Sequence, residues 1–382
     1  MTDEGSSEEA PSVEIDGALP AAREVTLVRP LSGSDSLGRA RADPDPGAAA
    51  QQSSTPPWSA PSRPRSGRVA RALAATSPRQ RLVIGWSVFG AAFVAFTVSL
   101  GLPYSEDDIL IWLTAALFVS CLGDTSKWRR GLLVDWLPLY AVLAGYGLLR
   151  GYASHVLWGP FVRPQVAFDS FIGGGQAPTV TLQRWLFRPG DLHPWDYAAW
   201  LVYMSHFFAS FVVAAVLWKR DHARFRRYIA LFVTLTFVGY VGYVLYPAMP
   251  PWLASQTGHL AHTTRIIPVV WNHVGVHGAA ALFTGGNRFD NNIAAMPSLH
   301  AAYPLLLAVF FWKRASAPLR ALLVTYVLAM AFTLVYTGEH FVIDELVGWT
   351  LAITVFLVGT RVLERRAARR RPSLAPLPSS TP

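Results

Sequence analysis

The 382-residue sequence has a single cysteine, Cys121, and few charged residues. One cysteine excludes a disulfide within the chain and a zinc site built from cysteines. Only 15% of the residues are charged, whereas 52% are hydrophobic, and the mean hydropathy is +0.30. So little charge in so apolar a chain is typical of a helical protein that crosses a membrane several times, and it argues against a soluble domain.

The charge is mostly positive, and the formal net charge is +9. A basic protein can bind nucleic acid, but here the Lys and Arg residues cluster beside apolar runs, which is where such residues orient membrane proteins. We therefore expect the lipid bilayer, and no nucleic acid, as the partner of these residues.

Residues 1–80 contain few of the large apolar side chains that fill the rest of the chain. This segment is rich in Pro, Ser, Gly and Ala, so it cannot bury enough surface to offset the entropy lost on ordering. It contains no short apolar core followed by a cleavage site, which argues against a signal peptide. We expect a disordered cytoplasmic region that ends in six arginines, spread over 63–81, ahead of the first span.

Eight apolar runs follow, and they predict an all-α, polytopic helical membrane protein with about eight transmembrane helices. A span needs about 20 apolar residues to cross roughly 30 Å of hydrocarbon. The runs lie at 82–102, 108–122, 132–151, 197–218, 228–248, 299–313, 319–336 and 341–361. The second and the sixth are short, and seven spans, or a re-entrant second segment, are the alternatives.

Positively charged loops alternate with loops that carry few Lys or Arg, and this alternation predicts the orientation of the spans. Clusters of basic residues lie at 219–227, at 313–320 and after the last run. The two long loops, at about 152–196 and 249–298, hold only five arginines between them. We therefore expect both termini in the cytoplasm and the two long loops outside it.

Two histidines stand at the outward ends of the last spans. The stretch "MPSLH" places His300 at the start of the sixth run, and "EHFVID" places His340 four residues before Asp344. Residues four apart share a helix face, and a carboxylate bound to one imidazole nitrogen leaves the other as a nucleophile or base. Ser298 can cap a helix whose N–H groups suit phosphate oxygens, and His300 can then protonate a leaving group. Two ordinary interfacial histidines are the alternative.

These motifs resemble those of the type 2 phosphatidic acid phosphatase superfamily, whose second motif is P-S-G-H and whose third is S-R-x5-H-x3-D. The variants "PSLH" and "GEHFVID" are most similar to the inositol phosphorylceramide synthase-like branch of inositolphosphotransferases. The upstream stretches "FIGGGQAPTVTLQRWLF" and "WLVYMSHFF" look like bacterial members of that branch. The resemblance implies that His340 forms a phosphohistidine, that Asp344 orients it, and that His300 is the general acid and later the base. It also implies that Pro297 and Ser298 form the phosphate-binding turn.

The resemblance covers about 170–361 and implies a six-helix catalytic core. The chain then divides into a disordered cytoplasmic region at 1–80, N-terminal transmembrane helices at 81–155, a catalytic membrane domain at 156–365 and a basic cytoplasmic tail at 366–382. A phospholipid or lipid phosphate is the expected substrate, with no cofactor and no metal. The expected location is a bacterial plasma membrane, with the active site on its extracytoplasmic face.

The chain departs from the family where the family has its phosphate-binding cations. Leu334 stands in place of the arginine of the third motif, and the first motif, K-x6-R-P, has no match. The phosphate charge still requires donors. We expect Arg288, twelve residues before His300 in an outward loop, to supply one, with Arg265 as the other candidate. The alternative is that both arginines only contact lipid headgroups.

Other polar residues near these motifs have weaker signals. His206 lies within the fourth run and has either a functional or a structural role, and Glu339 is either a second acid or a solvated loop residue. Four histidines of one outward loop lack a carboxylate and a regular helical spacing, so we expect no metal site there. They are His259, His262, His273 and His277.

Three kinds of function fit the sequence. The first is a phosphotransferase that passes a phospho-headgroup from a lipid donor to a lipid or polyol acceptor, and the second is a lipid phosphatase with water as acceptor. Both use one intermediate, so only the resemblance to the branch favours transfer. The third is a non-enzymatic membrane protein, such as a transporter, although paired halves and broken helices are not evident.

Overall fold

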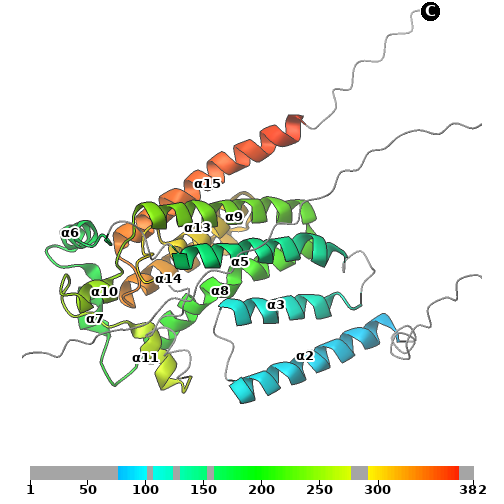
Figure 1. Ribbon diagram of the computed structural model, residues 1–382, viewed down its shortest axis with the longest axis horizontal. Coiled ribbons are helices and arrows are strands. Elements are labelled where there is room, and N and C mark those ends of the chain that lie inside the picture. The colour runs from blue at the N-terminus through cyan, green and yellow to red at the C-terminus, as the bar shows by residue number, and fades with distance from the viewer. Residues whose placement is uncertain (1–75, 101–105, 124–129, 153–158, 277–290, 370–382) are drawn as a thin grey trace, which may run out of the picture. The chain divides into compact units, whose positions relative to one another are not determined.

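The structure is a computed structural model that describes residues 76–100, 106–123, 130–152, 159–276 and 291–369 (Figure 1). These residues form helices joined by turns, and two isolated bridges are the only β-pairing among them. Most of the expected disordered segment, residues 1–75, and most of the expected tail, residues 370–382, lie outside the described residues.

Eight helices of the described chain occupy the eight apolar runs. They are α2 (Pro78–Leu100), α3 (Glu106–Ser120), α5 (Leu137–Tyr152), α8 (Pro194–Arg220), α9 (His222–Leu245), α13 (Leu299–Phe311), α14 (Ala317–Tyr336) and α15 (Val342–Arg369). A π-helical turn, η1 (Leu132–Trp136), leads into α5, and a 3-10 turn, η3 (Trp312–Arg314), ends α13. Six segments of the described chain are long and apolar enough to cross a membrane. An all-α, polytopic membrane protein is thereby confirmed.

The two runs that are short in the sequence form the two shorter helices. α3 has 15 residues and α13 has 13, so at 1.5 Å per residue they are about 22 and about 20 Å long. Both fall short of the roughly 30 Å of hydrocarbon that a span crosses. In contrast, α8 continues to Arg220 and α15 to Arg369, beyond the apolar runs. Basic residues at these ends are favourable because the C-terminal end of a helix is negative.

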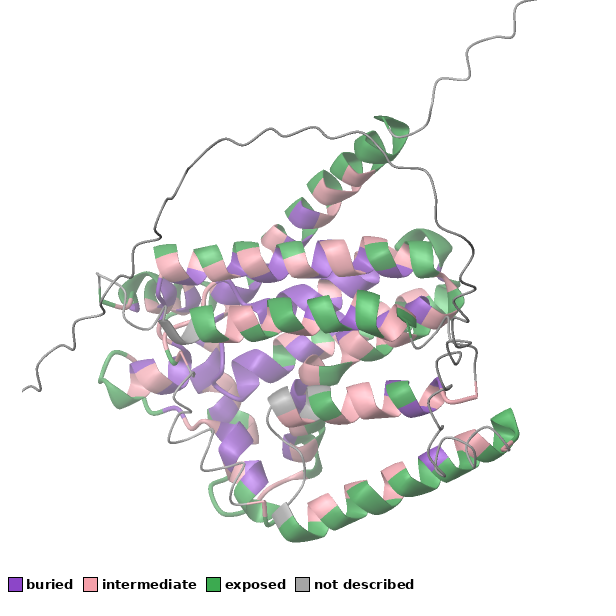
Figure 2. Cartoon of the chain, turned by 45° about the vertical axis from the view of Figure 1, so that its right-hand side comes forward, coloured by how far each residue is buried: buried purple, intermediate pink, exposed green. Residues whose placement is uncertain are grey.

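α13 lies in the interior, where longer helices surround it. It packs most extensively against α15 and α14, and also against α8 and α9. Its side chains are buried on most sides, which explains a run that is apolar throughout rather than amphipathic. Figure 2 shows this interior in purple, whereas α2, which packs mainly on α3, is largely exposed. Because His300 lies in the first turn of α13, the surrounding helices determine its position.

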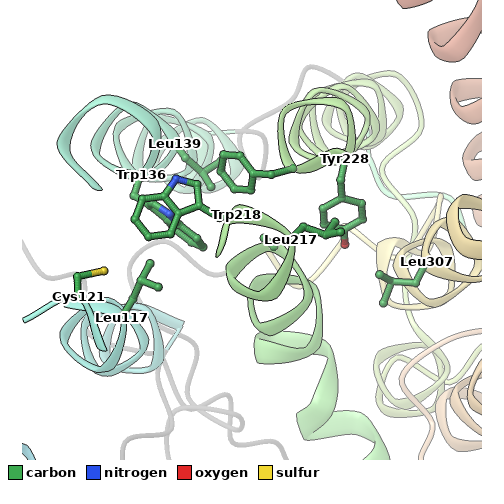
Figure 3. Close-up of a cluster of buried hydrophobic side chains, with 10 residues drawn as sticks. Leu117, Cys121, Trp136, Leu139, Leu217, Trp218, Tyr228 and Leu307 are labelled. Atoms are coloured by element: carbon green, nitrogen blue, oxygen red, sulfur yellow. The ribbon is translucent and has the colours of Figure 1, made fainter. Parts of the chain in front are cut away.

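A cluster of buried side chains joins the N-terminal helices to the rest of the described chain (Figure 3). Figure 3 labels Leu117, Cys121, Trp136, Leu139, Leu217, Trp218, Tyr228 and Leu307. Next to the cluster, Asp135 of η1 accepts a hydrogen bond from Trp218 at 2.9 Å and is hydrogen-bonded to His222 at 2.8 Å. The lone cysteine is fully buried among these apolar side chains.

Four short helices lie in the two long loops that we expect outside the cytoplasm. They are α6 (Arg163–Ile172), α7 (Pro178–Leu186), α10 (Pro251–Gln256) and α11 (Ile266–His273), called the loop helices below. α6 packs against α15, α7 against α14, and α11 against α8. The loop helices therefore contact α14 and α15, the two helices between which His340 lies. The orientation inferred from the loop charges stays a prediction.

Candidate active site

His300 and His340 meet although 40 residues separate them in the chain. His300 lies in the first turn of α13, and His340 lies two residues before α15. α14 runs back between them, so the two helix starts come together. Nε2 of His340 is 3.4 Å from Nδ1 of His300. His340 is 5% exposed, and His300 is half-buried.

Asp344 faces the other nitrogen of His340. Its Oδ2 lies 3.6 Å from Nδ1 of His340, just beyond hydrogen-bonding distance, and the same oxygen accepts the N–H of Phe341 at 3.0 Å. Asp344 itself is fully buried. The ring of His340 therefore stands between a carboxylate and a second imidazole. If the proton of the neutral ring is on Nδ1, facing Asp344, then Nε2, the nitrogen beside His300, carries the lone pair.

Ser298 caps α13, as the sequence predicts. Its Oγ accepts the N–H of Ala301 at 3.2 Å, and its own N–H donates to the carbonyl of Asp344 at 3.0 Å. The second bond joins the start of α13 to the first turn of α15. Gly348 of α15 makes this approach possible, since a Cβ there would lie 2.2 Å from the carbonyl oxygen of Ser298. Pro297 precedes the cap residue and packs on α9.

The arginine position of the family's third motif holds Leu334, which is fully buried among apolar side chains. Of the two candidate cations, Arg288 lies outside the described residues. Arg265 forms a bidentate ion pair with Glu339, in which Nε lies 2.8 Å from Oε1 and Nη2 lies 3.1 Å from Oε2. Its guanidinium also lies 4.7 Å from the ring centroid of Trp252. Glu339 is therefore a buried, paired acid, and the pair stands next to the candidate nucleophile.

A third histidine, His206 of α8, also lies at the site. Its ring stacks on that of His300 with the centroids 3.9 Å apart, and the ring of Tyr203 stacks on His300 at 5.1 Å. This contact places His206 against the candidate acid. In the part of the chain that the structure describes, no group of three or more His, Cys, Asp or Glu side chains could hold a metal ion. His277 of the outward loop lies outside that part.

Asp169 of α6 is a buried polar residue of the site that the sequence analysis missed. It is fully buried and accepts the N–H of Val342 at 2.9 Å and that of Ile343 at 3.3 Å. Burial raises the pKa of Asp169 to about 6, the two N–H groups act in the opposite direction, and the charge of Asp344 adds to the rise. A second carboxylate thus lies at the start of α15.

Gln183 of α7 holds the end of α14 in a similar way. Its amide donates to the carbonyls of Thr264 and Tyr336, both at 2.8 Å, and accepts the N–H of Thr264 at 2.8 Å. The hydroxyl of Tyr336 donates in turn to Asp196 in the first turn of α8. Gln183 lies in the stretch "FIGGGQAPTVTLQRWLF", whose resemblance to the branch did not single it out. The one sequence signal for Asp169 is an isolated acid between apolar residues in "VAFDSF".

The geometry defines a helical membrane protein with two facing histidines and a carboxylate where its spans begin. A family model described as the PAP2 superfamily matches residues 178–358, which include all three side chains. This part of the chain is therefore similar to the PAP2 superfamily, that of the type 2 phosphatidic acid phosphatases.

Curated relatives confirm the likeness to the inositol phosphorylceramide synthase-like branch. The phosphoinositol dihydroceramide synthase of Bacteroides thetaiotaomicron is 26% identical over 175 residues, which are 44% of this chain and 57% of that protein. The inositol phosphorylceramide synthase catalytic subunit of Schizosaccharomyces pombe is 24% identical over 300 residues, 72% of this chain and 59% of that protein. Its namesake from Saccharomyces cerevisiae is 25% identical over 182 residues, 42% of this chain and 41% of that protein. The chain thus spans about half the length of these relatives, and no solved structure matches it.

Proposed function

We propose that the protein is an integral membrane phosphotransferase that moves a phospho-headgroup between lipid substrates through a phosphohistidine on His340. The observation that carries this proposal is the place of His340 between two partners, Asp344 at Nδ1 and His300 at Nε2. A nucleophile oriented by a carboxylate and paired with a proton donor suits transfer through a covalent intermediate. The relatives are named as synthases of inositol phosphorylceramide and phosphoinositol dihydroceramide, which favours transfer over hydrolysis.

In the first step, Nε2 of His340 attacks the phosphorus atom of the donor lipid. The N–P bond forms while the bond from phosphorus to the leaving oxygen breaks, and His300 gives its proton to that oxygen. Asp344 stabilises the positive charge that develops on the attacking ring. The lipid alcohol departs, and the phospho-headgroup stays on His340.

In the second step, a hydroxyl group of the acceptor attacks the same phosphorus atom. His300, now neutral, takes the proton of that hydroxyl, and the N–P bond breaks. His340 is then free for another cycle, and His300 has regained its proton. Water in place of the acceptor hydroxyl would make the same site a lipid phosphatase, so the acceptor alone separates these two functions.

The negative charge of the phosphate has to be balanced near His340. In this proposal, the turn of Pro297 and Ser298 and the side chain of Arg288 bind the phosphate. Arg265 is the alternative cation, because its pair with Glu339 holds it beside the nucleophile. Both arginines belong to a loop whose low positive charge predicts an extracytoplasmic location, so the reaction takes place at the outer leaflet.

The test follows phosphorus-labelled lipids on the purified protein. A panel of labelled phospholipids is offered with and without a ceramide, a diacylglycerol or inositol as acceptor, and quenched samples are examined for base-stable, acid-labile label on the protein. We expect this label on the parent and none on His340→Ala, with the phosphorus passing to the added acceptor. An active parent without such label, together with turnover by His340→Ala, would refute the phosphohistidine. Release of the phosphorus to water whichever acceptor is added would make the protein a phosphatase.

A further inference from the structure

α15 begins two residues after His340, at a point where its own sequence supplies no usual cap. The four residues before it are Gly, Glu, His and Phe, whereas helices are normally capped by Ser, Thr, Asn or Asp. The first N–H groups of a helix have no partner inside the helix, and burying them unpaired is costly. Some other part of the chain therefore has to supply acceptors.

Two carboxylates supply these acceptors. Asp344, in the first turn of α15, accepts the N–H of Phe341 at 3.0 Å. Asp169, 173 residues upstream of Val342, accepts the next two N–H groups, that of Val342 at 2.9 Å on Oδ2 and that of Ile343 at 3.3 Å on Oδ1. A carboxylate is favourable at this end of a helix because the N-terminal end carries a partial positive charge.

α6 presents Asp169 to α15 from a helix that turns its polar side inward. Gln165 and Asp169 are fully buried, whereas Phe171 and Ile172 at the end of the same helix are exposed. α6 packs against α15, and its Val166 contacts the buried cluster that contains Phe341. The packing of α6 on α15, and of Val166 on this cluster, thus holds the carboxylate of Asp169 in place.

Asp169 and Asp344 act on one short piece of chain. Asp344 is both a cap of α15 and the group that faces Nδ1 of His340 at 3.6 Å. Without Asp169, the first turn of α15 loses two of its anchors, and Asp344 in that turn shifts relative to His340. A displacement of about 1 Å in a reacting group can reduce a rate roughly 10²-fold.

We propose that Asp169 is a positioning residue of the phosphotransfer site, which caps α15 from α6 and thereby sets Asp344 against His340. This inference rests on the proposed function. Asp169 contacts no reacting atom and acts only through the backbone of α15. Its pKa, raised by burial to about 6, leaves the carboxyl ionised at pH 7, so both of its oxygens accept hydrogen bonds.

The kinetic test compares Asp169→Ala and Asp169→Asn with Asp191→Asn, a control at an exposed aspartate of the same outward loop. Asparagine keeps the size of the side chain and one acceptor oxygen, and alanine keeps neither. We expect kcat of Asp169→Ala to fall by roughly 10²-fold with little change in KM. Asp169→Asn should lie between Asp169→Ala and the parent, and Asp191→Asn should match the parent. An unchanged kcat per folded molecule in Asp169→Asn, even with a lowered unfolding temperature, would overturn the positioning role.

A second readout does not depend on activity. Hydrogen–deuterium exchange in peptides that cover 337–346 should be faster in Asp169→Asn than in the parent, while peptides from α9 should be unchanged. A parent that transfers no phosphorus would refute the proposed function, and the exchange would still show whether Asp169 caps α15. If residues 337–346 exchange at the parent rate, Asp169 does not cap α15. If Asp169→Ala does not fold, both measurements, kcat and hydrogen–deuterium exchange, are made on Asp169→Asn alone.

Discussion

Gly348 marks the place where α15 crosses the start of α13, and alanine at this position tests how strongly the site depends on that approach. A Cβ at Gly348 would lie 2.2 Å from the carbonyl oxygen of Ser298 and 3.1 Å from its carbonyl carbon. Both are backbone atoms, which cannot rotate away as a side chain can. Because ordinary contact begins at 3.4 Å, Gly348→Ala has to separate the two helices by up to 1.2 Å, the difference between 3.4 and 2.2 Å.

This displacement falls on the residues that hold the site. Ser298 donates its N–H to the carbonyl of Asp344 at 3.0 Å, and Gly348 lies one turn beyond Asp344 on the same face of α15. Overpacking a well-packed interior costs about 1–3 kcal/mol, and a misplacement of about 1 Å can lower a rate roughly 10²-fold. We expect Gly348→Ala to lose stability and kcat by about these amounts.

Two other glycines provide matched controls. A Cβ at Gly359, further along α15, would lie 2.5 Å from Cδ2 of Leu231, the end of a flexible side chain that can move. A Cβ at Gly145 of α5 would have nothing within 4 Å. The assay measures kcat and thermal unfolding of the three alanine variants in one detergent. If kcat of Gly348→Ala equals that of Gly359→Ala, the close approach of α15 to α13 does not set the geometry of the site, and the reasoning is wrong.

Three further predictions concern orientation, charge and pH. In a cysteine-free background, Gln256→Cys should react with an impermeant thiol reagent in intact cells and Ala223→Cys only after lysis, since both positions are exposed; the reverse pattern would overturn the orientation. Arg288→Ala should lower activity by roughly 10²-fold, the scale of losing one preorganised donor, and a loss confined to Arg265→Ala would assign the phosphate to Arg265 instead. Because burial raises the pKa of Asp169 from 3.8 to about 6, ionisation of its carboxyl weakens the folded state, and stability is lost as the pH rises through this range. The unfolding temperature of Asp169→Asn should therefore vary less with pH here than that of the parent, and equal slopes would contradict the shift.

Local composition was enough to predict the eight apolar helices and the place of the motifs, although α3 and α13 are shorter than a span. Each of the eight apolar runs forms a helix in the described chain, because a helix in lipid or in the interior is apolar over its whole length. Ser298 caps α13 because it directly precedes the sixth run. His300 and His340 meet because one return helix separates the ends on which they lie.

The loop helices could not be predicted in the same way, because they are short and their partners are distant in the sequence. α6 turns Asp169 inward and leaves Phe171 exposed, the reverse of the pattern by which a helix on a soluble core is recognised. Asp169 bonds to Val342 across 173 residues, and Gln183 bonds to Tyr336 across 153. No local window of sequence contains both partners, so only the fold reveals which polar residues hold the site.

Two loop arginines are candidates to replace the missing motif arginine, and they lie at different distances from the motifs along the chain. Arg288 is the expected donor because it lies only twelve residues before His300 in the sequence. Arg265 is farther away in the chain, but its neighbour Ile266 donates an N–H to the carbonyl of Thr337 at 3.1 Å, which places the start of α11 against the loop that carries the nucleophile. Leu334 can therefore complete the apolar packing of α14 while a guanidinium reaches the same region from another loop. A cation supplied by a loop can be exchanged without disturbing the helices, and in the described chain Glu339 balances the charge of Arg265 through their ion pair.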